Sequence, residues 1–310
     1  MSNKSSRNDG DSTSGKPGDD GPSGTPGGRP LAHPGGGRGW AALPQEVREG
    51  VRAHTGDIHR TESAPEGSGG RVTVTLHTDA GRVFVRAAPT GHPRAWAQEC
   101  EAAVNPYILP FGPRLLWRVT RGGWDLLGFE YLSGRAAEYG PHGDDLPLVA
   151  DAMTSLGELN CPPGVPVRDA ASHWGGYLDD PADAARFGGS ALLHTDWHHA
   201  NVLFTDPAEE SGTLPHVAVA RLLDWGRATR GAGWIDPACW VVWLVLAGNS
   251  PYDAEQWAAK IPAWSGAASR DVDLFATAQA RLWRDTARRH PSAMTHRLRA
   301  ATADWAAHRA

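Results

Sequence analysis

Hydrophobic and polar residues alternate in short runs through the first half of the chain. Residues 71–76 (RVTVTL) and 82–86 (RVFVR) flank the turn-forming sequence Asp79-Ala80-Gly81. Residues 114–117 and 124–129 flank a second turn of the same kind. A period of two is typical of strands, and a short polar turn between two such runs joins them into a hairpin. The first half is therefore predicted to form a small antiparallel sheet.

Helical spacing interrupts these strands. Residues 95–104 have apolar positions at helical intervals, with Glu101 and Val104 on one face. Near the start, Val47 and Val51 mark a short amphipathic helix that ends by Gly56. Positions that repeat every three to four residues lie on one face of a helix. One main helix is thus expected to break the order of the strands.

The second half is mostly helical in pattern. A helix over 146–159 is expected to start at an Asp145 cap and to bury Leu148, Ala152, Leu156 and Leu159. Residues 161–189 are irregular, and strands are expected on either side of a polar loop at 206–215. Asp236-Pro237 is predicted to start an apolar helix that runs through Ala247. Further amphipathic helices follow near 253–261, 271–289 and 292–308. The predicted fold class is α+β, with a small sheet-bearing part followed by a larger helical part.

Composition divides the chain into three parts. Residues 1–39 consist mainly of Gly, Pro, Ser and Asp, and they hold too few apolar side chains to offset the entropy of ordering. We predict a disordered tail over 1–39, an N-terminal lobe over 40–130 and a C-terminal lobe over 131–310.

Charge and apolar content narrow the classes of partner. The formal net charge of −5 argues against a nucleic-acid binder. The start of the chain has no apolar signal region, and the longest apolar stretch, residues 237–248, is too short to span a bilayer. Three cysteines without metal-like spacing fit a reducing compartment. We therefore expect a cytoplasmic protein with neither a nucleic-acid nor a membrane partner.

The chemistry concentrates in two stretches. Residues 190–204 (SALLHTDWHHANVLF) hold His194, Asp196 and Asn201 in the spacing H-x-D-x-x-x-x-N, between two apolar runs. Residues 221–226 (RLLDWG) place Asp224 at the end of another apolar run. One carboxylate can accept a hydroxyl proton, while an amide and a second carboxylate can hold Mg²⁺ against the phosphates of a nucleotide.

A glycine-rich segment, residues 66–70 (EGSGG), precedes the first predicted hairpin. Its glycines allow the backbone to approach phosphate groups closely. An ordinary flexible loop has the same composition, so both interpretations stay open.

Together these stretches resemble the aminoglycoside phosphotransferase and choline kinase branch of the protein-kinase-like fold. HTDWHHAN resembles the catalytic loop of that family, LLDWG its second metal-binding segment, and residues 230–237 (RGAGWIDP) the segment that follows. The resemblance covers roughly residues 56 to 308, nearly all of the chain outside the tail. It implies a bilobal kinase-like fold.

The resemblance also implies a role for each residue that matches a motif. Asp196 would orient or deprotonate the acceptor hydroxyl, and Asn201 and Asp224 would bind Mg²⁺. His194 and Asp236 would support the loop. ATP or GTP would be the phosphoryl donor, with its phosphates under Gly67, Ser68, Gly69 and Gly70 and its base against the segment that holds Phe129 and Tyr131.

Two positions depart from the family pattern. The lysine that such enzymes carry on the third strand is replaced by Arg86, and an arginine is longer and planar, so the exchange is not conservative. Its expected partner is Glu101, with Glu99 as the alternative. Trp240 stands where many relatives carry a further Asp, and we expect only a packing consequence.

The histidines, tryptophans and acidic residues near these motifs allow other interpretations. The cluster of His194, Asp196, His198 and His199 lacks the pattern and the second ligand set of a zinc hydrolase, so His198 and His199 are expected to face solvent or substrate. Trp174 and Trp197 are candidate substrate contacts. The acidic residues Asp179, Asp180 and Asp183 either attract a cationic acceptor, such as an aminoglycoside or choline, or form a solvated surface.

Two hypotheses about function follow. The first is a small-molecule kinase, a phosphotransferase with an alcohol group as acceptor, that uses Mg²⁺ and ATP or GTP. The alternative is a nucleotide-binding pseudokinase with little or no transfer activity, because Arg86 replaces the usual lysine.

Overall fold

The computed structural model describes residues 39–63, 71–205 and 219–310. The chain divides after Gly36 into two units, and everything described below belongs to the second, Gly37–Ala310. Residues 1–38 of the predicted tail and the glycine-rich segment 66–70 lie outside the described residues. The boundaries at 39/40 and 130/131 stay predictions.

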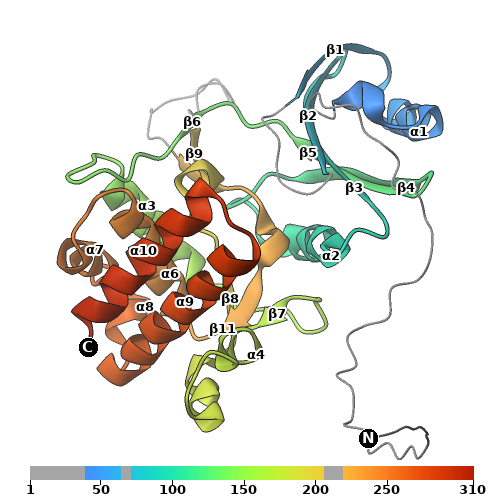
Figure 1. The fold of residues 1–310 in the computed structure, drawn as a ribbon. Helices are drawn as coiled ribbons and strands as arrows, with labels where there is room; N and C mark the ends of the chain where they lie inside the picture. The colour runs from blue at the N-terminus through green and yellow to red at the C-terminus, as the bar shows by residue number, and fades with distance from the viewer. Residues whose placement is uncertain (1–38, 64–70, 206–218) are drawn as a thin grey trace, which may run out of the picture. The chain divides into compact units, whose positions relative to one another are not determined.

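The first part of the described chain forms a five-stranded antiparallel sheet (Figure 1). Its strand order is β1-β2-β3-β5-β4, and both predicted hairpins are present as β2–β3 and β4–β5. The edge strand β1 was not predicted, because five of its six residues are exposed and it shows no apolar alternation. The bounds are β1 (Ile58–Ser63), β2 (Val72–Thr78), β3 (Gly81–Pro89), β4 (Leu115–Arg121) and β5 (Trp124–Glu130).

Two helices pack near this sheet. Helix α1 (Gln45–Thr55) buries Val47 and Val51, as its spacing predicts. Helix α2 (Ala95–Val104) has the predicted bounds, and Figure 1 shows it below the sheet, on the side of the helical part. The Gln98 amide of α2 donates to the backbone oxygen of Asp125 on β5 at 2.7 Å, which fixes the helix to the sheet.

Close packing inside the sheet depends on one glycine. A Cβ atom at Gly128 on β5 would lie 2.2 Å from the indole of Trp117 on β4. Only glycine leaves room for this indole, which belongs to an apolar cluster with Val47, Val85 and Leu126. This cluster is separate from the larger core of the helical part.

The rest of the chain is mainly helical, as predicted, and it also holds two small three-stranded sheets (Figure 1). One sheet has the order β10-β9-β6, and the other β7-β11-β8. The strands are β6 (Arg135–Ala136), β7 (Arg168–Asp169), β8 (Ala191–Leu193), β9 (Val202–Thr205), β10 (Val219–Leu222) and β11 (Thr229–Gly231). The helices are α3 (Leu146–Leu156), α4 (Ala170–Gly175), α6 (Ile235–Leu246), α7 (Pro251–Ala258), α8 (Pro262–Ser265), α9 (Ser269–Arg289) and α10 (Ala293–His308).

The end, the buried residues and the cap of α3 differ from the prediction. The helix ends at Leu156 and buries Leu146, Val149, Ala150, Met153 and Leu156, whereas Leu148 is only half-buried. Asp145 makes no capping hydrogen bond. Its carboxylate binds the guanidinium of Arg135 at 2.6 Å and accepts from the backbone N–H of Glu138 at 2.8 Å, so its oxygens are used outside the helix.

The start of α6 also differs from the prediction. The helix begins at Ile235, so Asp236 lies inside its first turn and does not cap it. This shift leaves the Asp236 carboxylate available to another segment, which proves to be the loop after β8. The apolar sequence of α6 is explained by burial of most of its residues, Trp240 included, in the larger core.

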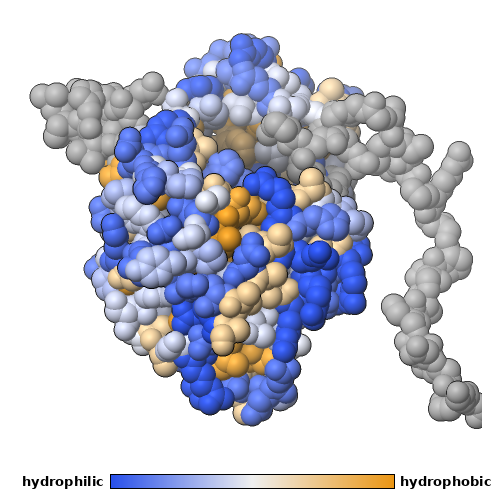
Figure 2. Space-filling model, turned by 60° about the vertical axis from the view of Figure 1, so that its left-hand side comes forward, coloured by the Kyte–Doolittle hydropathy of each residue, from blue (hydrophilic) through white to orange (hydrophobic). Residues whose placement is uncertain are grey.

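The architecture is α+β, as predicted, with the five-stranded sheet and the helical part on either side of a hollow. In the face drawn in Figure 2, the surface is hollowed below the part that carries the sheet, and hydrophobic residues gather beside the hollow. Within the three described stretches, none of the helices has the length and apolar character needed to cross a bilayer.

Candidate active site

The loop between β8 and β9 carries His194, Asp196 and Asn201. It follows a buried strand, and its first residues are held by the carboxylate of Asp236 on α6. The backbone N–H groups of His194 and Thr195 donate to the two oxygens of this carboxylate at 2.9 and 2.8 Å. Thr195 has a φ of 62°, a conformation that a β-branched residue rarely adopts. The two hydrogen bonds that Asp236 accepts stabilise this turn.

His194 is fully buried and joins the two motif stretches. Its Nδ1 accepts from the N–H of Asp196 at 3.2 Å, so Nε2 carries the proton and donates to the backbone oxygen of Leu223 at 2.9 Å. Its ring also meets the indole of Trp225 edge-on, with 4.8 Å between centroids. These contacts place His194 behind the loop, in a supporting position.

Pairing of β9 with β10 brings Asn201 and Asp224 to one end of a hairpin. Val202 is the register partner of Leu222, and the N–H of Leu223 donates to the backbone oxygen of Asn201 at 2.8 Å. The Asn201 side-chain amide donates to the backbone oxygen of Asp196 at 3.0 Å. Asp196, Asn201 and Asp224 therefore meet at the same edge of the helical part.

Arg86 on β3 lies opposite this edge and binds two carboxylates. Its Nη1 lies 2.6 Å from Oδ1 of Asp224 and 3.0 Å from Oε2 of Glu101. The Arg86 side chain is 11% exposed and that of Glu101 is 5% exposed, so this ion pair is almost entirely removed from water. One guanidinium thus joins the sheet, helix α2 and the loop after β10.

The charges of this network reinforce one another. Burial by itself would raise the pKa of Asp224, but Arg86 and Arg71 outweigh it and lower that pKa to about 2. Burial would lower the pKa of Arg86, but Asp224 and Glu101 raise it above its usual value. Burial raises the pKa of Glu101, an effect that Arg86 opposes. Asp224 is therefore an anion throughout the physiological range.

Of the two candidate partners of Arg86, the structure shows that Glu101 contacts it and Glu99 does not. Glu101 contacts Arg86 through both carboxylate oxygens, at 3.1 and 3.0 Å. Glu99 is 54% exposed and binds Arg118 at 2.7 Å. Residues 99 and 101 lie on different faces of the helix, and only Glu101 faces Arg86.

A cavity of about 260 Å³ lies on the sheet side of this ion pair. Phe129 and Tyr131 line it, as the resemblance implies, together with Phe84, Leu132, Leu203 and Leu223. Phe129 is buried, and the guanidinium of Arg82 lies 4.0 Å from the ring centroid of Tyr131. A cavity lined by these apolar and aromatic side chains fits an aromatic base.

A larger cavity of about 530 Å³ lies on the other side, and Asp196 lines it. Arg86 and Asp224 line both cavities, so the two meet at the ion pair. A nucleotide with its base in the smaller cavity would pass its phosphates along Arg86 toward Asp196.

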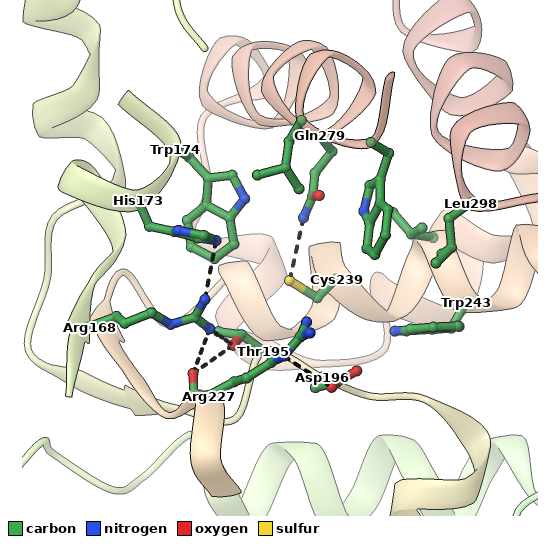
Figure 3. A pocket seen from close by; sticks show the side chains of 13 residues that line it. Arg168, His173, Trp174, Thr195, Asp196, Arg227, Cys239, Trp243, Gln279 and Leu298 are labelled. Atoms are coloured by element: carbon green, nitrogen blue, oxygen red, sulfur yellow. Dashed lines mark hydrogen bonds and ion pairs between the residues drawn. The ribbon is translucent and has the colours of Figure 1, made fainter. Parts of the chain in front are cut away.

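A smaller recess also lies beside Asp196 (Figure 3). Figure 3 shows Arg168, Thr195 and Arg227 side by side, with His173 and Trp174 on one wall and Trp243 and Leu298 on another. Sequence reasoning missed Arg71, Arg168, His173 and Arg227 as site residues. Two of these residues had a local signal in the sequence: Arg227 lies three residues after Asp224, and Arg71 directly follows the glycine-rich segment 66–70. Arg168 and His173 reach the site only through folding.

Asn201 and Asp224 could bind Mg²⁺ together with water and phosphate oxygens, but they are too few to hold a metal ion by protein ligands alone. Among the described residues, no group of three or more His, Cys, Asp or Glu side chains could hold a metal. Mg²⁺ is usually held by one or two protein oxygens together with waters and substrate phosphates. Asp224 offers a carboxylate, and Asn201 uses its amide nitrogen for Asp196, which leaves its amide oxygen as a ligand. This donor set therefore fits Mg²⁺ carried with a nucleotide.

Several expectations about neighbouring residues have clear outcomes. Trp197 is fully buried against His194, whereas Trp174 lines the recess beside Asp196. His199 is exposed, but His198 packs against Trp243 with 4.7 Å between ring centroids.

The three acidic residues of the irregular region are engaged within the chain. Asp179 binds Arg281 at 2.8 Å, and Asp183 binds Arg186 at 2.8 Å and Arg270 at 3.3 Å. The carboxylate of Asp180 accepts from the N–H of Ala182 at the start of a 3₁₀ helix. None of these carboxylates lines the cavities beside Asp196.

Comparison with known proteins gives a result only at the level of structure. No family model and no curated protein matches the sequence. The GDP complex of aminoglycoside 2'-phosphotransferase-IIIa matches with a TM-score of 0.56 at 15% identity, over 84% of this chain and 98% of that one. The chain has the protein-kinase-like fold of the aminoglycoside phosphotransferases.

Other solved structures support the same fold. A thermostable mutant of aminoglycoside phosphotransferase APH(4)-Ia matches with a TM-score of 0.53 at 15% identity, over 83% of this chain and 98% of that one. Spectinomycin phosphotransferase APH(9)-Ia, in complex with ADP and spectinomycin, matches with a TM-score of 0.52 at 11% identity, over 84% and 93%. The kinase-like fold that the motifs imply is thereby confirmed.

The buried ion pair generates the first prediction. Glu101→Gln removes the carboxylate that Arg86 contacts through two oxygens, and we expect it to lower the free energy of unfolding by about 1–3 kcal/mol. Glu99→Gln is the matched control two residues away, and its exposed pair with Arg118 is worth less than about 1 kcal/mol. Urea unfolding of both variants measures the difference. Equal losses would contradict the assignment of Glu101 as the partner.

Proposed function

We propose that this protein is a small-molecule kinase that transfers the γ-phosphoryl group of ATP or GTP to an alcohol group. The observation that carries the proposal is the meeting of Asp196, Asn201 and Asp224 at one edge, between a cavity for a base and a cavity for an acceptor. The nucleotide complexes of proteins with the same fold, with ADP, GDP or AMP-PNP, support a nucleotide donor.

The chemistry assigned to each residue follows from its place. Asp196 accepts the proton of the acceptor hydroxyl while the oxygen of that hydroxyl forms a bond to the γ-phosphorus. The bond between the γ-phosphorus and the bridging oxygen of the β-phosphate breaks. The products are a phosphate monoester and the nucleoside diphosphate. Arg86, with Arg71 beside it, compensates the negative charge of the phosphates. Mg²⁺ bound at Asn201 and Asp224 would neutralise charge on the β- and γ-phosphates.

Two residues keep the loop in this geometry without touching the reacting atoms. Asp236 fixes the turn at Thr195, and His194 ties the loop to the backbone of Leu223. Burial raises the pKa of Asp236, although the N–H groups of His194 and Thr195 oppose this shift. Both are therefore assigned as positioning residues.

Replacement of the base tests the proposal. Asp196→Asn keeps the shape of the side chain but removes its ability to take a proton, so we expect phosphoryl transfer to fall by about 10²–10⁴-fold. Asp304→Asn on the exposed face of α10 is the control and should retain full activity. The assay is coupled detection of nucleoside diphosphate with Mg-ATP or Mg-GTP across a panel of hydroxyl compounds. Undiminished transfer by Asp196→Asn would refute the assignment.

A second candidate function is favoured by one contact. Nη1 of Arg86 already occupies Oδ1 of Asp224, the proposed metal ligand, so Mg²⁺ and Arg86 compete for the same carboxylate. If Arg86 does not yield, the protein binds a nucleotide without transferring its phosphate. This is the pseudokinase alternative.

Arg86→Lys separates the two candidates. If Arg86 is the working phosphate ligand, the shorter lysine loses its bidentate contacts, and we expect kcat/KM for transfer to fall about tenfold or more. A gain of activity would show that the arginine obstructs the metal site. Thermal-shift titration with Mg-ATP and Mg-GTP, paired with a slow-hydrolysis assay, completes the test. Nucleotide binding without hydrolysis or transfer would favour the pseudokinase.

A further inference from the structure

The cavity beside Asp196 is strongly cationic. Six arginines and two histidines line it, against only two aspartates, Asp196 and Asp224. The arginines are Arg71, Arg86, Arg94, Arg168, Arg227 and Arg289. A cavity of this charge attracts anions and repels cationic ligands.

The arginines near Asp224 are accounted for by the proposed nucleotide. Arg86 binds Glu101 and Asp224, and Arg71 acts on the same two carboxylates through space. Both belong to the phosphate-binding side of the cavity. Neither of them lines the recess next to Asp196.

Arg168 is a cation of a different kind. Its guanidinium donates to the backbone oxygen of Arg227 at 2.7 Å and to the Thr195 hydroxyl at 3.1 Å, and its Nη1 lies 3.3 Å from Nε2 of His173. All three partners are neutral groups, and no carboxylate among the described residues forms an ion pair with it. Burial, together with the charge of Arg227, lowers the pKa of Arg168 to about 10. A largely buried cation without an anion costs free energy that a bound anion would recover.

His173 does not supply the missing negative charge. Because arginine only donates, Nε2 of His173 accepts from Arg168, and the ring is neutral in this contact. Burial, followed by the charges of Arg168 and Arg227, lowers the pKa of His173 to about 4. His173 therefore orients Arg168 and adds no negative charge beside it, and Asp196 acts on Arg168 only through space, without an ion pair.

Arg227 connects this cation to the proposed base. Its backbone oxygen binds Arg168, while its own Nε lies 3.7 Å from Oδ2 of Asp196. The Arg227 side chain is 43% exposed and faces the cavity, so it can contact a ligand as well as Asp196. A ligand anion next to Arg168 and Arg227 would thus lie beside Asp196, and the two guanidinium groups would offset its repulsion by that carboxylate.

The recess has room for such a group. It measures about 50 Å³, which exceeds the ~10–15 Å³ that one water molecule needs. Arg168, His173, Asp196 and Arg227 line both the recess and the larger cavity, so a ligand can extend from one into the other. The rest of the lining, which includes Trp174, Trp243 and Leu298, is mostly apolar, and Gln279 adds an amide.

We propose that the acceptor of this kinase is an anion whose carboxylate or phosphate binds at Arg168 and Arg227, which presents a nearby hydroxyl of the same molecule to Asp196. The proposal rests on the proposed function and deepens it by naming the acceptor class. The pairing of Asp179 and Asp183 with arginines supports it, because those carboxylates are not available to attract a cationic acceptor.

Binding of inorganic phosphate to the full-length protein gives the most direct test. Calorimetry at neutral pH should show binding to the wild type that becomes about tenfold weaker or more in Arg168→Gln, because a charge-assisted contact is lost. Arg230→Gln is the matched control, since it removes the same charge from β11, where Arg230 is exposed and pairs with Asp169. Arg168→Lys should restore part of the affinity and shows whether a loss reflects charge or folding.

Phosphate could also bind on the nucleotide side, and Arg86→Gln distinguishes the two locations. If Arg86→Gln abolishes phosphate binding and Arg168→Gln leaves it unchanged, the anion site belongs to the nucleotide and the inference is overturned. Absence of phosphate binding to the wild type overturns it as well.

A transfer assay with matched acceptors supplies the second arm. Gluconate and sorbitol differ by one carboxylate, glucose 6-phosphate and glucose differ by one phosphate, and glucosamine adds a cation. We expect kcat/KM to favour the anionic member of each pair about tenfold or more, and Arg168→Gln to remove the preference. A preference for glucosamine overturns the anionic acceptor but leaves the kinase intact. If no acceptor is phosphorylated in a reaction that depends on Asp196, the proposed kinase function is refuted. Phosphate binding that depends on Arg168 would still show an anion site.

Discussion

The contact of Arg86 with Glu101 and Asp224 is the interaction on which the site depends. It joins strand β3, helix α2 and the loop after β10 through one nearly buried guanidinium. Removing one partner of a buried ion pair is destabilising, because the remaining charge loses part of its compensation. This contact is one of those that join the sheet to the helical part, and Arg86 and Asp224 border both cavities. In the proposed kinase, Arg86 would also be a phosphate ligand.

Much of this arrangement could be predicted from sequence, because the signals are local. The alternation around β2–β3 and β4–β5, the spacing of α2 and the motif H-x-D-x-x-x-x-N all lie within short stretches. What escaped prediction depends on tertiary contacts. Strand β1 has no apolar alternation because it is an exposed edge, and Asp145 and Asp236 look like helix caps until their real partners, Arg135 and the turn at Thr195, are seen.

The cationic recess illustrates the same limit. Arg168 precedes α4, His173 lies within it, and Arg227 follows the Asp224 motif, so no sequence spacing links all three. Parallel pairing of β7 with β11 brings Arg168 beside the 227–229 segment, and the hydrogen bond to the backbone of Arg227 fixes its position. Of the acidic residues that sequence alone offers for a cationic acceptor, Asp179 and Asp183 pair with arginines. Asp180 accepts from a backbone N–H group. The acidic residues of the sequence therefore suggest a cationic ligand, whereas the arginines that line the cavity suggest an anionic one.

A structure of the protein with Mg²⁺ and a non-hydrolysable ATP or GTP analogue is the most direct test of the proposed site. We expect the base between Phe129 and Leu203, Mg²⁺ on Asp224 and Asn201, and the γ-phosphate facing Asp196. We also expect Arg86 to move from Oδ1 of Asp224 onto the phosphates and to keep Glu101. A nucleotide bound elsewhere, or bound here with Arg86 still on Asp224 and no metal, would refute the proposed site.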